Sequence, residues 1–242
     1  HVLFSDIASK YETGSYQEAA ILPPFSMLIC DEAHKLEAGA ISYFSRQASR
    51  PGILRTLGAL TSTSRKRRGQ GILQVLKPHT SDPAAFDAFS ALAGDLAQVL
   101  QAADDGAAQL AGERRSLWIP WDMGESCTDL TRSLEQAVGI LGLMGTCLKR
   151  IWESVEEQDE IRYPLKLLTG YTRKLADHRE VCTEFLRIGE STDRVFWLER
   201  RQHAREGGIL FHVTPLSVAE TLQEALHAHM DTLVGTSATL TV

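Results

Sequence analysis

The sequence lacks several features that would assign it at once to a broad class of protein. No apolar run approaches the roughly 18 residues that a membrane-spanning helix needs, and the N-terminus has no secretory signal pattern. The four cysteines stand far apart, without a CxxC pair or the dense spacing of a disulfide framework. These absences predict a cytoplasmic protein without membrane contact, whose cysteines are reduced and mostly buried.

A phosphate-binding loop of the form GxxxxGK(S/T) is also missing. The backbone cradle and the lysine that such a loop provides for phosphates are therefore not encoded in these residues. The chain starts with His1 rather than methionine, which fits an excised segment or a processed product. We expect that the chain alone does not hydrolyse nucleoside triphosphates.

The composition is that of an ordinary globular protein with one unusual segment. Hydrophobic residues make up 43% and charged residues 23% of 242 residues, which allows one large domain or two smaller ones. The net charge of −6 argues against general binding to nucleic acid, but residues 46–79 contain eight basic residues and no Asp or Glu. The eight are Arg46, Arg50, Arg55, Arg65, Lys66, Arg67, Arg68 and Lys77.

This basic segment predicts contact with the phosphate backbone of single-stranded DNA, above all through residues 65–68, with Arg46 and Arg55 contributing. An acidic chain gains little from concentrating positive charge in one place unless an anion is bound there. Neighbouring serines and glycines indicate a loop, which suits backbone contacts better than base readout. The alternative is a solvated loop, or one neutralised by the acidic residues 153–160.

A short apolar run near the start of the chain ends abruptly in two acids. Residues 25–30 follow Pro23 and Pro24 and precede Asp31 and Glu32. Short apolar runs bounded by chain breakers are typical of buried strands, here a parallel one. In open α/β sheets ligands bind at the carboxyl ends of such strands, where these two acids would emerge.

The last quarter of the chain has the same α/β character. It contains three predicted strands, at residues 195–198, 209–213 and 232–234, and one predicted helix, at residues 216–227. The final strand leads into a hydroxyl cluster formed by Thr236, Ser237 and Thr239. Both ends of the chain therefore deliver polar groups from buried strands, and we expect them to meet at one site.

The middle of the chain is helical instead. Apolar residues at helical spacing predict helices over residues 92–103, 134–155 and 164–186. The second helix has the spacing of a coiled-coil seam and nothing else of matching length to bury against. This predicts a long antiparallel hairpin over residues 130–186.

These patterns predict an α/β fold with a large, mainly helical insertion. Residues 1–47 and 191–242 form the α/β part, and residues 48–190 form the insertion. Trp118 and Trp121 stand in a predicted loop of the insertion, where packing against the insertion is favoured over stacking on bases.

Residues 31–34, which read Asp-Glu-Ala-His, carry the sharpest chemical signal. Hydrolysis of a nucleoside triphosphate needs one carboxylate to hold Mg²⁺ and another to orient and deprotonate water, and adjacent acids after a strand supply both. The competing interpretation is that the acids cap the N-terminus of a helix. Likewise, the hydroxyl cluster either bonds these acids or satisfies local backbone groups.

The order of these motifs resembles a known family. The DEAH sequence of residues 31–34, the helical insertion, the ILFHVTP sequence of residues 209–215 and the TSATLT sequence of residues 236–241 follow one another as in DinG/XPD-like superfamily 2 DNA helicases. The opening residues 1–6, HVLFSD, resemble the tail of the NHxLLxxD segment ahead of the DEAH box in that family. The middle of the chain matches only as a helical insertion of the right size at the right place.

This resemblance implies an internal segment of an ATP-dependent DNA helicase that moves 5′ to 3′ on single-stranded DNA. The α/β part would belong to its first RecA-like motor domain, and the insertion would be the arch domain. Asp31 would hold Mg²⁺ through water, and Glu32 would be the catalytic base. His34 and the hydroxyl cluster would couple the state of the nucleotide to movement on DNA.

The missing phosphate loop limits what is expected of the chain alone. ATP and Mg²⁺ are the cofactors expected of the full-length parent, and neither is expected to bind the isolated chain. The expected partners are single-stranded DNA and the remaining helicase domains, including a second motor lobe beyond Val242. The pattern leaves open whether the parent has an iron-sulfur cluster, and no cysteine here is assigned to one. The alternative function is a non-enzymatic helical interaction module with a vestigial DEAH box.

Overall fold

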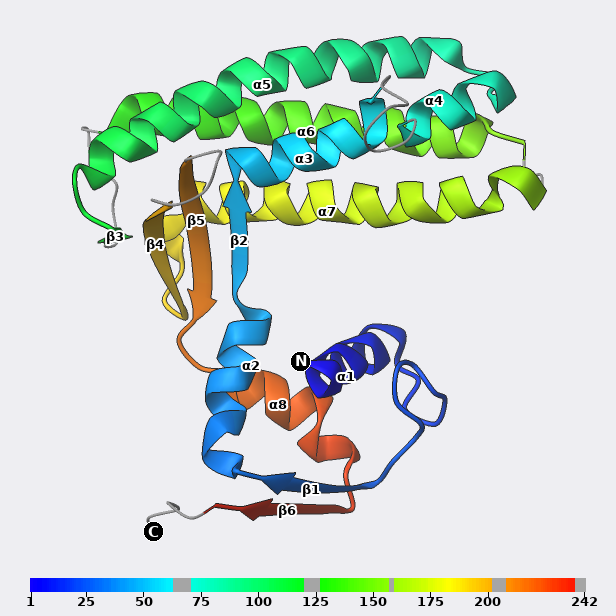
Figure 1. Cartoon of the computed structure of the whole chain (residues 1–242). Helices are drawn as coiled ribbons and strands as arrows, with labels where there is room; N and C mark the ends of the chain where they lie inside the picture. Colours follow the sequence, from blue (N-terminus) through cyan, green and yellow to red (C-terminus); the bar gives the residue numbers. More distant parts are fainter. Residues whose placement is uncertain (63–70, 120–126, 157–158, 202–207, 238–242) are drawn as a thin grey trace. The chain divides into compact units, whose positions relative to one another are not determined.

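The protein is mixed α/β, with helices predominating, and it divides into two compact units. The computed structural model describes residues 1–62, 71–119, 127–156, 159–201 and 208–237 (Figure 1). Unit 1 comprises His1–Arg46, Asp193–Val195 and Thr214–Val242, and unit 2 comprises Gln47–Thr192 and Phe196–Val213. None of the helices in the described ranges combines the length and the apolar character that crossing a membrane requires.

Unit 1 packs three helices against a small sheet. Its helices are α1 (Val2–Thr13), α2 (Leu36–Phe44) and α8 (Ala219–Ala225), and its strands are β1 (Met27–Asp31) and β6 (Thr232–Thr236). The core consists of buried apolar side chains from these helices and from the residues beside α8: Phe4, Ile7, Ala40, Val218, Leu222, Ala225 and Leu226. Segments from the two ends of the chain therefore share one core. The sequence pattern did not predict α1.

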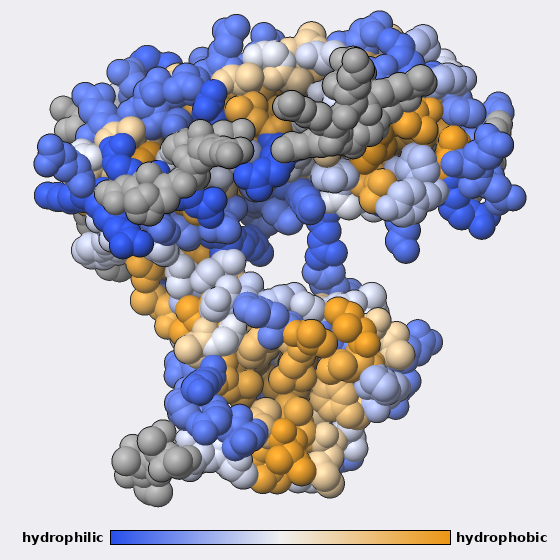
Figure 2. Space-filling model, in the orientation of Figure 1, coloured by the Kyte–Doolittle hydropathy of each residue, from blue (hydrophilic) through white to orange (hydrophobic). Residues whose placement is uncertain are grey.

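Strands β1 and β6 confirm two predicted strands and pair in parallel along their whole length. The expected burial is not found, because Met27 and Ile29 are 60% and 67% exposed. Side chains alternate between the two faces of a strand, so these residues share a face with Val234 while Leu28 packs into the core on the other face. Figure 2 shows apolar side chains gathered at the surface of unit 1. One face of this parallel sheet is thus apolar and exposed.

A buried ion pair fixes the segment ahead of β1. Asp6 and Lys10 lie one turn apart on α1, with Oδ2 and Nζ separated by 2.8 Å, and both side chains are buried. The other carboxylate oxygen of Asp6 accepts the backbone amides of Ile21 and Leu22, at 2.9 and 2.8 Å. A buried carboxylate is tolerated when it is paired and hydrogen-bonded, and Asp6 meets both conditions. The chain therefore enters β1 from an anchored position.

Long helices dominate unit 2. The three predicted helices are confirmed as α5 (Pro83–Ala111), α6 (Thr128–Ser154) and α7 (Arg162–Leu186). Helix α5 begins where the Asp82 side chain accepts the amide of Ala85, with Pro83 as its first residue. Two shorter helices, α3 (Arg50–Thr61) and α4 (Ile72–Leu76), pack against the same core. Helices α6 and α7 run antiparallel, as predicted (Figure 1).

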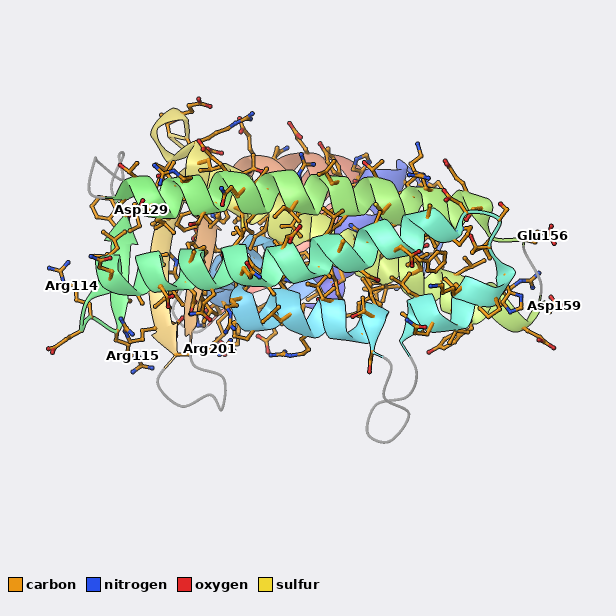
Figure 3. The ribbon with its side chains drawn as sticks, turned by 90° about the horizontal axis from the view of Figure 1, so that it is seen from above. Arg114, Arg115, Asp129, Glu156, Asp159 and Arg201 are labelled. Atoms are coloured by element: carbon orange, nitrogen blue, oxygen red, sulfur yellow. The ribbon has the colours of Figure 1, made fainter. Side chains whose placement is uncertain are left out.

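The expectation that α6 has only α7 to bury against is wrong. Helix α5 has 29 residues, packs along α6 and matches its length (Figure 3). Its buried stripe continues through the small residues Ala103, Ala107 and Ala111. Small side chains give a weak hydrophobic signal, so the sequence pattern placed the end of α5 too early. The seam of α6 is buried between two helices rather than one.

A four-stranded sheet completes unit 2. Its strands lie in the order β2 (Arg46–Ser49), β5 (Gly208–Pro215), β4 (Arg194–Arg201) and β3 (Ser116–Ile119). Phe185 of α7 meets Phe196 and Phe211 edge to face, with ring centroids 5.4 and 5.2 Å apart. Through these contacts most of β4 and β5 belongs to unit 2. Residues 191–242, which the sequence pattern assigned as a whole to the α/β part, are therefore divided between the two units.

Trp118 lies in β3 and not in the expected loop. It is opposite Trp197 of β4 in an antiparallel pair. A run of four residues is too short to show strand periodicity, which explains why the sequence did not predict β3. Pro120 and Trp121 lie outside the described residues.

His178 of α7 should make the stability of unit 2 depend on pH. Burial lowers the pKa of its imidazole, and this outweighs the raising effects of Asp177 and of a hydrogen bond with the Gln47 backbone. The unfolded state, with a histidine pKa of about 6.5, therefore binds more protons than the folded state does. The stabilisation is present above that pKa and is lost as pH falls through the lower folded pKa. We expect the free energy of unfolding to fall between about pH 7 and pH 5 in denaturant titrations.

Histidine-to-glutamine variants test this dependence. His178→Gln should flatten the slope in part, because burial also lowers the pKa of His212 and leaves a second contribution. His227→Gln makes the same substitution at an exposed histidine and serves as the control. Equal slopes for the wild type and both variants would show that His178 has no such role.

Candidate functional site

The DEAH residues occupy a sharp turn between β1 and α2. Asp31 is the last residue of β1, and Glu32 follows with φ 54° and ψ 45°, in the left-handed region. Apart from glycines, Glu32 has the only positive φ among the described residues. This conformation costs about 1–2 kcal/mol in a residue with a side chain. A short 3₁₀ helix, Ala33–Lys35, then leads into α2. Such strain tends to collect at functional sites, so the turn is a candidate site in its own right.

Strand β6 brings a hydroxyl to Asp31. Thr236 lies opposite Asp31 in the parallel register, and its Oγ1 donates a hydrogen bond of 2.8 Å to Asp31 Oδ1. The same oxygen accepts the backbone amide of Glu32 at 2.9 Å. Gly235 leaves room for this approach, because a Cβ at that position would lie 3.1 Å from the Cβ of Ala33, which is tighter than an ordinary contact. Asp31 Oδ1 thus accepts two hydrogen bonds, one from the hydroxyl at the end of β6 and one from the backbone just after β1.

His34 links Glu32 to the hydroxyl cluster. Its Nδ1 lies 2.7 Å from Ser237 Oγ and 3.2 Å from Glu32 Oε2. One imidazole nitrogen therefore stands within reach of a carboxylate from the β1 turn and a hydroxyl that follows β6. Asp31, Glu32 and His34 are all exposed, so a ligand can reach them.

No known protein-family model matches the chain, and no curated protein matches it. Five predicted site residues, Asp31, Glu32, His34, Thr236 and Ser237, are brought together within unit 1.

The oxygen donors of this site fit a hard divalent cation. Mg²⁺ binds through one or two carboxylates and keeps several waters and substrate phosphates as its other ligands. Asp31 offers one carboxylate oxygen that is not occupied by the two bonds at Oδ1. Among the described residues, no three or more His, Cys, Asp and Glu side chains gather as a metal site. A magnesium ion here would thus depend on Asp31, water and the phosphates of a nucleotide.

The other predicted site residues lie elsewhere or outside the described ranges. Arg46 is half-buried in β2, and Arg55 is exposed on α3. Thr239 and the basic residues 65–68 fall outside the described residues. The sequence did not predict the close contact at Gly235 or the left-handed backbone of Glu32. The available signal for the first was a glycine directly after the predicted strand at residues 232–234.

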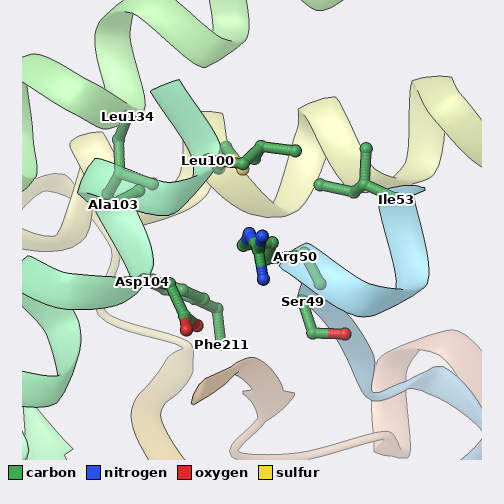
Figure 4. Close-up of a pocket in the computed structure, with 10 residues that line it drawn as sticks. Ser49, Arg50, Ile53, Leu100, Ala103, Asp104, Leu134 and Phe211 are labelled. Carbon is green, nitrogen blue, oxygen red and sulfur yellow. The ribbon is translucent and has the colours of Figure 1, made fainter. Parts of the chain in front are cut away.

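A small cavity in unit 2 is a packing feature. It has a volume of about 10 Å³, enough for one water molecule, and Arg50 and Asp104 line it (Figure 4). Asp104 accepts the backbone amide of Ile209 at 2.8 Å and so ties α5 to the start of β5. Burial raises the pKa of Asp104, although the Ile209 hydrogen bond and Arg50 oppose the rise. The cavity is too small for a nucleotide or a base.

Proposed function

We propose that the chain is an internal segment of an ATP-dependent DNA helicase that moves 5′ to 3′, of the DinG/XPD-like kind. Unit 1 would be part of a RecA-like motor domain, and the helices of unit 2 would be an arch domain. One observation carries the proposal: the parallel pairing of β1 with β6 places Thr236 on the carboxylate of Asp31. Motifs about two hundred residues apart in the sequence meet at the carboxyl ends of parallel strands, where α/β folds bind ligands.

The roles of the residues follow from their contacts. Asp31 would hold Mg²⁺ through water, and the ion would supply positive charge to the phosphates of ATP. Glu32 accepts the proton of the attacking water, and His34 orients the Glu32 carboxylate from 3.2 Å. Thr236, Ser237 and Thr239 would couple this site to movement on DNA; the first two contact Asp31 and His34. A movement of Asp31 or His34 would then act directly on Thr236 or Ser237, at the end of β6.

The exposed sheet face supports a larger motor domain around unit 1. Parallel sheets normally have both faces covered, whereas the face with Met27, Ile29 and Val234 is exposed. Apolar side chains on such a face are stabilised by further elements packed over them. The remaining helicase domains are the partners that we propose to cover it.

The isolated chain should not turn over ATP. Phosphoryl transfer depends on positioning the phosphates, and the sequence has no GxxxxGK(S/T) loop to do so. Phosphate release from the purified 242-residue chain should equal that of buffer, with or without single-stranded DNA. Steady release that Glu32→Gln abolishes would contradict this expectation.

We further propose that the basic residues 65–68 contact the phosphates of single-stranded DNA. Each phosphate that is neutralised on a single strand contributes about 0.7 to the slope of log affinity against log salt. Changing all four residues to alanine should weaken binding to unrelated sequences and lower that slope by up to about three. The measurement is fluorescence anisotropy of a labelled oligonucleotide at several salt concentrations, using the longer helicase that we propose contains this chain.

A second quadruple variant controls for the loss of charge. It replaces four exposed basic residues of α7 by alanine: Arg162, Lys166, Arg173 and Lys174. This control removes the same charge from a different surface, so its slope should stay near that of the wild type. Equal slopes for both variants would mean that residues 65–68 act only through net charge.

Strand displacement tests the proposed function. The longer protein that carries this chain is incubated with ATP and with duplexes that have a single-stranded tail at either the 5′ or the 3′ side. We expect displacement from the 5′-tailed duplex alone. No displacement of either substrate would contradict the proposal and favour an interaction module. A preference for the 3′ tail would contradict the proposed direction of movement.

A further inference from the structure

The four-stranded sheet of unit 2 has an outer face that carries aromatic rings. Leu117 and Ile119 of β3 and Phe196 and Leu198 of β4 point to the core side. Side chains alternate along strands, so the residues between them point to the other side. Trp118 and Trp197 lie there as direct neighbours across the β3–β4 pair, as do Ser116 and Glu199.

Two of the aromatic rings on this face are held in a fixed orientation. Trp197 stacks on His212 of β5, with ring centroids 3.8 Å apart and planes 6° from parallel. Nε2 of His212 lies 3.1 Å from Glu199 Oε2, and this contact fixes the orientation of the imidazole. Trp118, next to this stack on the edge strand, is 59% exposed. A tryptophan so exposed in the middle of a strand leaves much of its ring surface open to a planar ligand.

Arginines flank these rings. Arg201 shares the outer face of β4 with Trp197, since the two are four residues apart on one strand. Arg114 and Arg115 are exposed just before β3, and Figure 3 shows all three arginines at one end of unit 2. The anionic Glu156 and Asp159 lie at the opposite end (Figure 3).

Among the described residues, most of the acidic groups near the rings are paired. Glu199 lies on the same face, Glu113 precedes Arg114, and Asp129 lies at the same end of unit 2 (Figure 3), where Arg132 pairs with it at 3.1 Å. The carboxylate of Glu199 is engaged with His212. The end of unit 2 that bears the rings therefore favours a ligand with both flat rings and negative charge.

We infer that this face binds the bases of single-stranded DNA by stacking on the exposed ring of Trp118, beside the fixed stack of Trp197 and His212. Every base has a π-face, whereas bases in a duplex are already stacked on one another, so a single strand suits an exposed ring on a sheet. The arginines at the end of the strands supply contacts for phosphates. The residues of this site are distant from Asp31 in the sequence, and binding here requires no ATP. The inference rests on the proposed function only in naming DNA as the ligand.

Fluorescence anisotropy of the full 242-residue chain without ATP tests the inference. The probes are a labelled fifteen-residue oligothymidylate and an abasic strand of equal length, which keeps the phosphates but has no bases. The oligothymidylate should bind more tightly than the abasic strand. Trp118→Ala should weaken oligothymidylate binding by about 5- to 100-fold, the range for loss of one base stack. Trp118→Phe retains a ring and should restore most of the affinity.

Trp152→Ala is the matched control. Trp152 is 54% exposed near the end of α6, beside Glu153, so the same substitution removes an equally exposed ring from another surface of the unit. Its affinity should stay within about twofold of the wild type, since surface substitutions have small effects. Equal binding of the two strands, an unchanged affinity for Trp118→Ala, or no binding of the oligothymidylate would each overturn the inference. Loss of ATP hydrolysis in the longer protein would not affect it, so the two proposals fail separately.

Discussion

Leu141→Asp should unfold the helical part of unit 2. Leu141 lies in the seam of α6, 3% exposed, in the core cluster that also contains Leu100 of α5 and Leu168 of α7. Aspartate there would place an unpaired carboxylate among apolar side chains and remove the packing of leucine. The combined cost is on the order of 5 kcal/mol, a large fraction of the stability of a domain. We expect loss of most helical circular dichroism at 25 °C, or a large drop in melting temperature.

Leu143→Asp is the control for this substitution. Leu143 is two residues further along α6 and 57% exposed, so the same change adds a charge to the solvent-facing side of the same helix. Its melting curve should be close to that of the wild type. If Leu141→Asp melted like Leu143→Asp, the assignment of the α6 seam to the core would be wrong.

The sequence predicted the elements whose own side chains carry a strong pattern. The alternating steps of three and four in α6 and the apolar run before Asp31 identify a helix and a strand without tertiary information. The strand that precedes Thr236 was found in the same way, and its pairing with β1 then places that hydroxyl near Asp31. Parallel strands leave little freedom in where their carboxyl ends meet, which explains why this part of the site was foreseeable.

What was missed depends on contacts that no local pattern records. Strand β3 has four residues and owes its place to pairing with β4. The membership of β4 and β5 in unit 2 follows from Phe196 and Phe211 packing on Phe185, which lies in a different element. The left-handed backbone of Glu32 is set by the turn between β1 and α2, and its residue type gives no hint of it. The exposed Trp118 was expected to pack, because aromatic residues usually do.

Glu32→Gln in the longer protein should lower the rate of ATP hydrolysis by about 10²- to 10⁴-fold, the range for loss of a general base. Glutamine keeps the shape of the side chain and can still bond His34 through its amide, but it cannot accept the proton of water. Asp31 and its bond from Thr236 are unchanged, so Mg²⁺ and ATP should still bind. The loss should therefore appear in kcat, with little change in KM.

The most direct test of the account is DNA-stimulated ATP hydrolysis by the longer protein, measured for the wild type, Glu32→Gln and Glu37→Gln. Glu37 is an exposed glutamate in the first turn of α2, five residues after Glu32, and so controls for the substitution itself. The account predicts that single-stranded DNA stimulates hydrolysis by the wild type and by Glu37→Gln, and that Glu32→Gln lowers the stimulated rate at least about 100-fold. Hydrolysis by Glu32→Gln near the wild-type rate, or no hydrolysis by the wild type with DNA present, would contradict the assignment of this site.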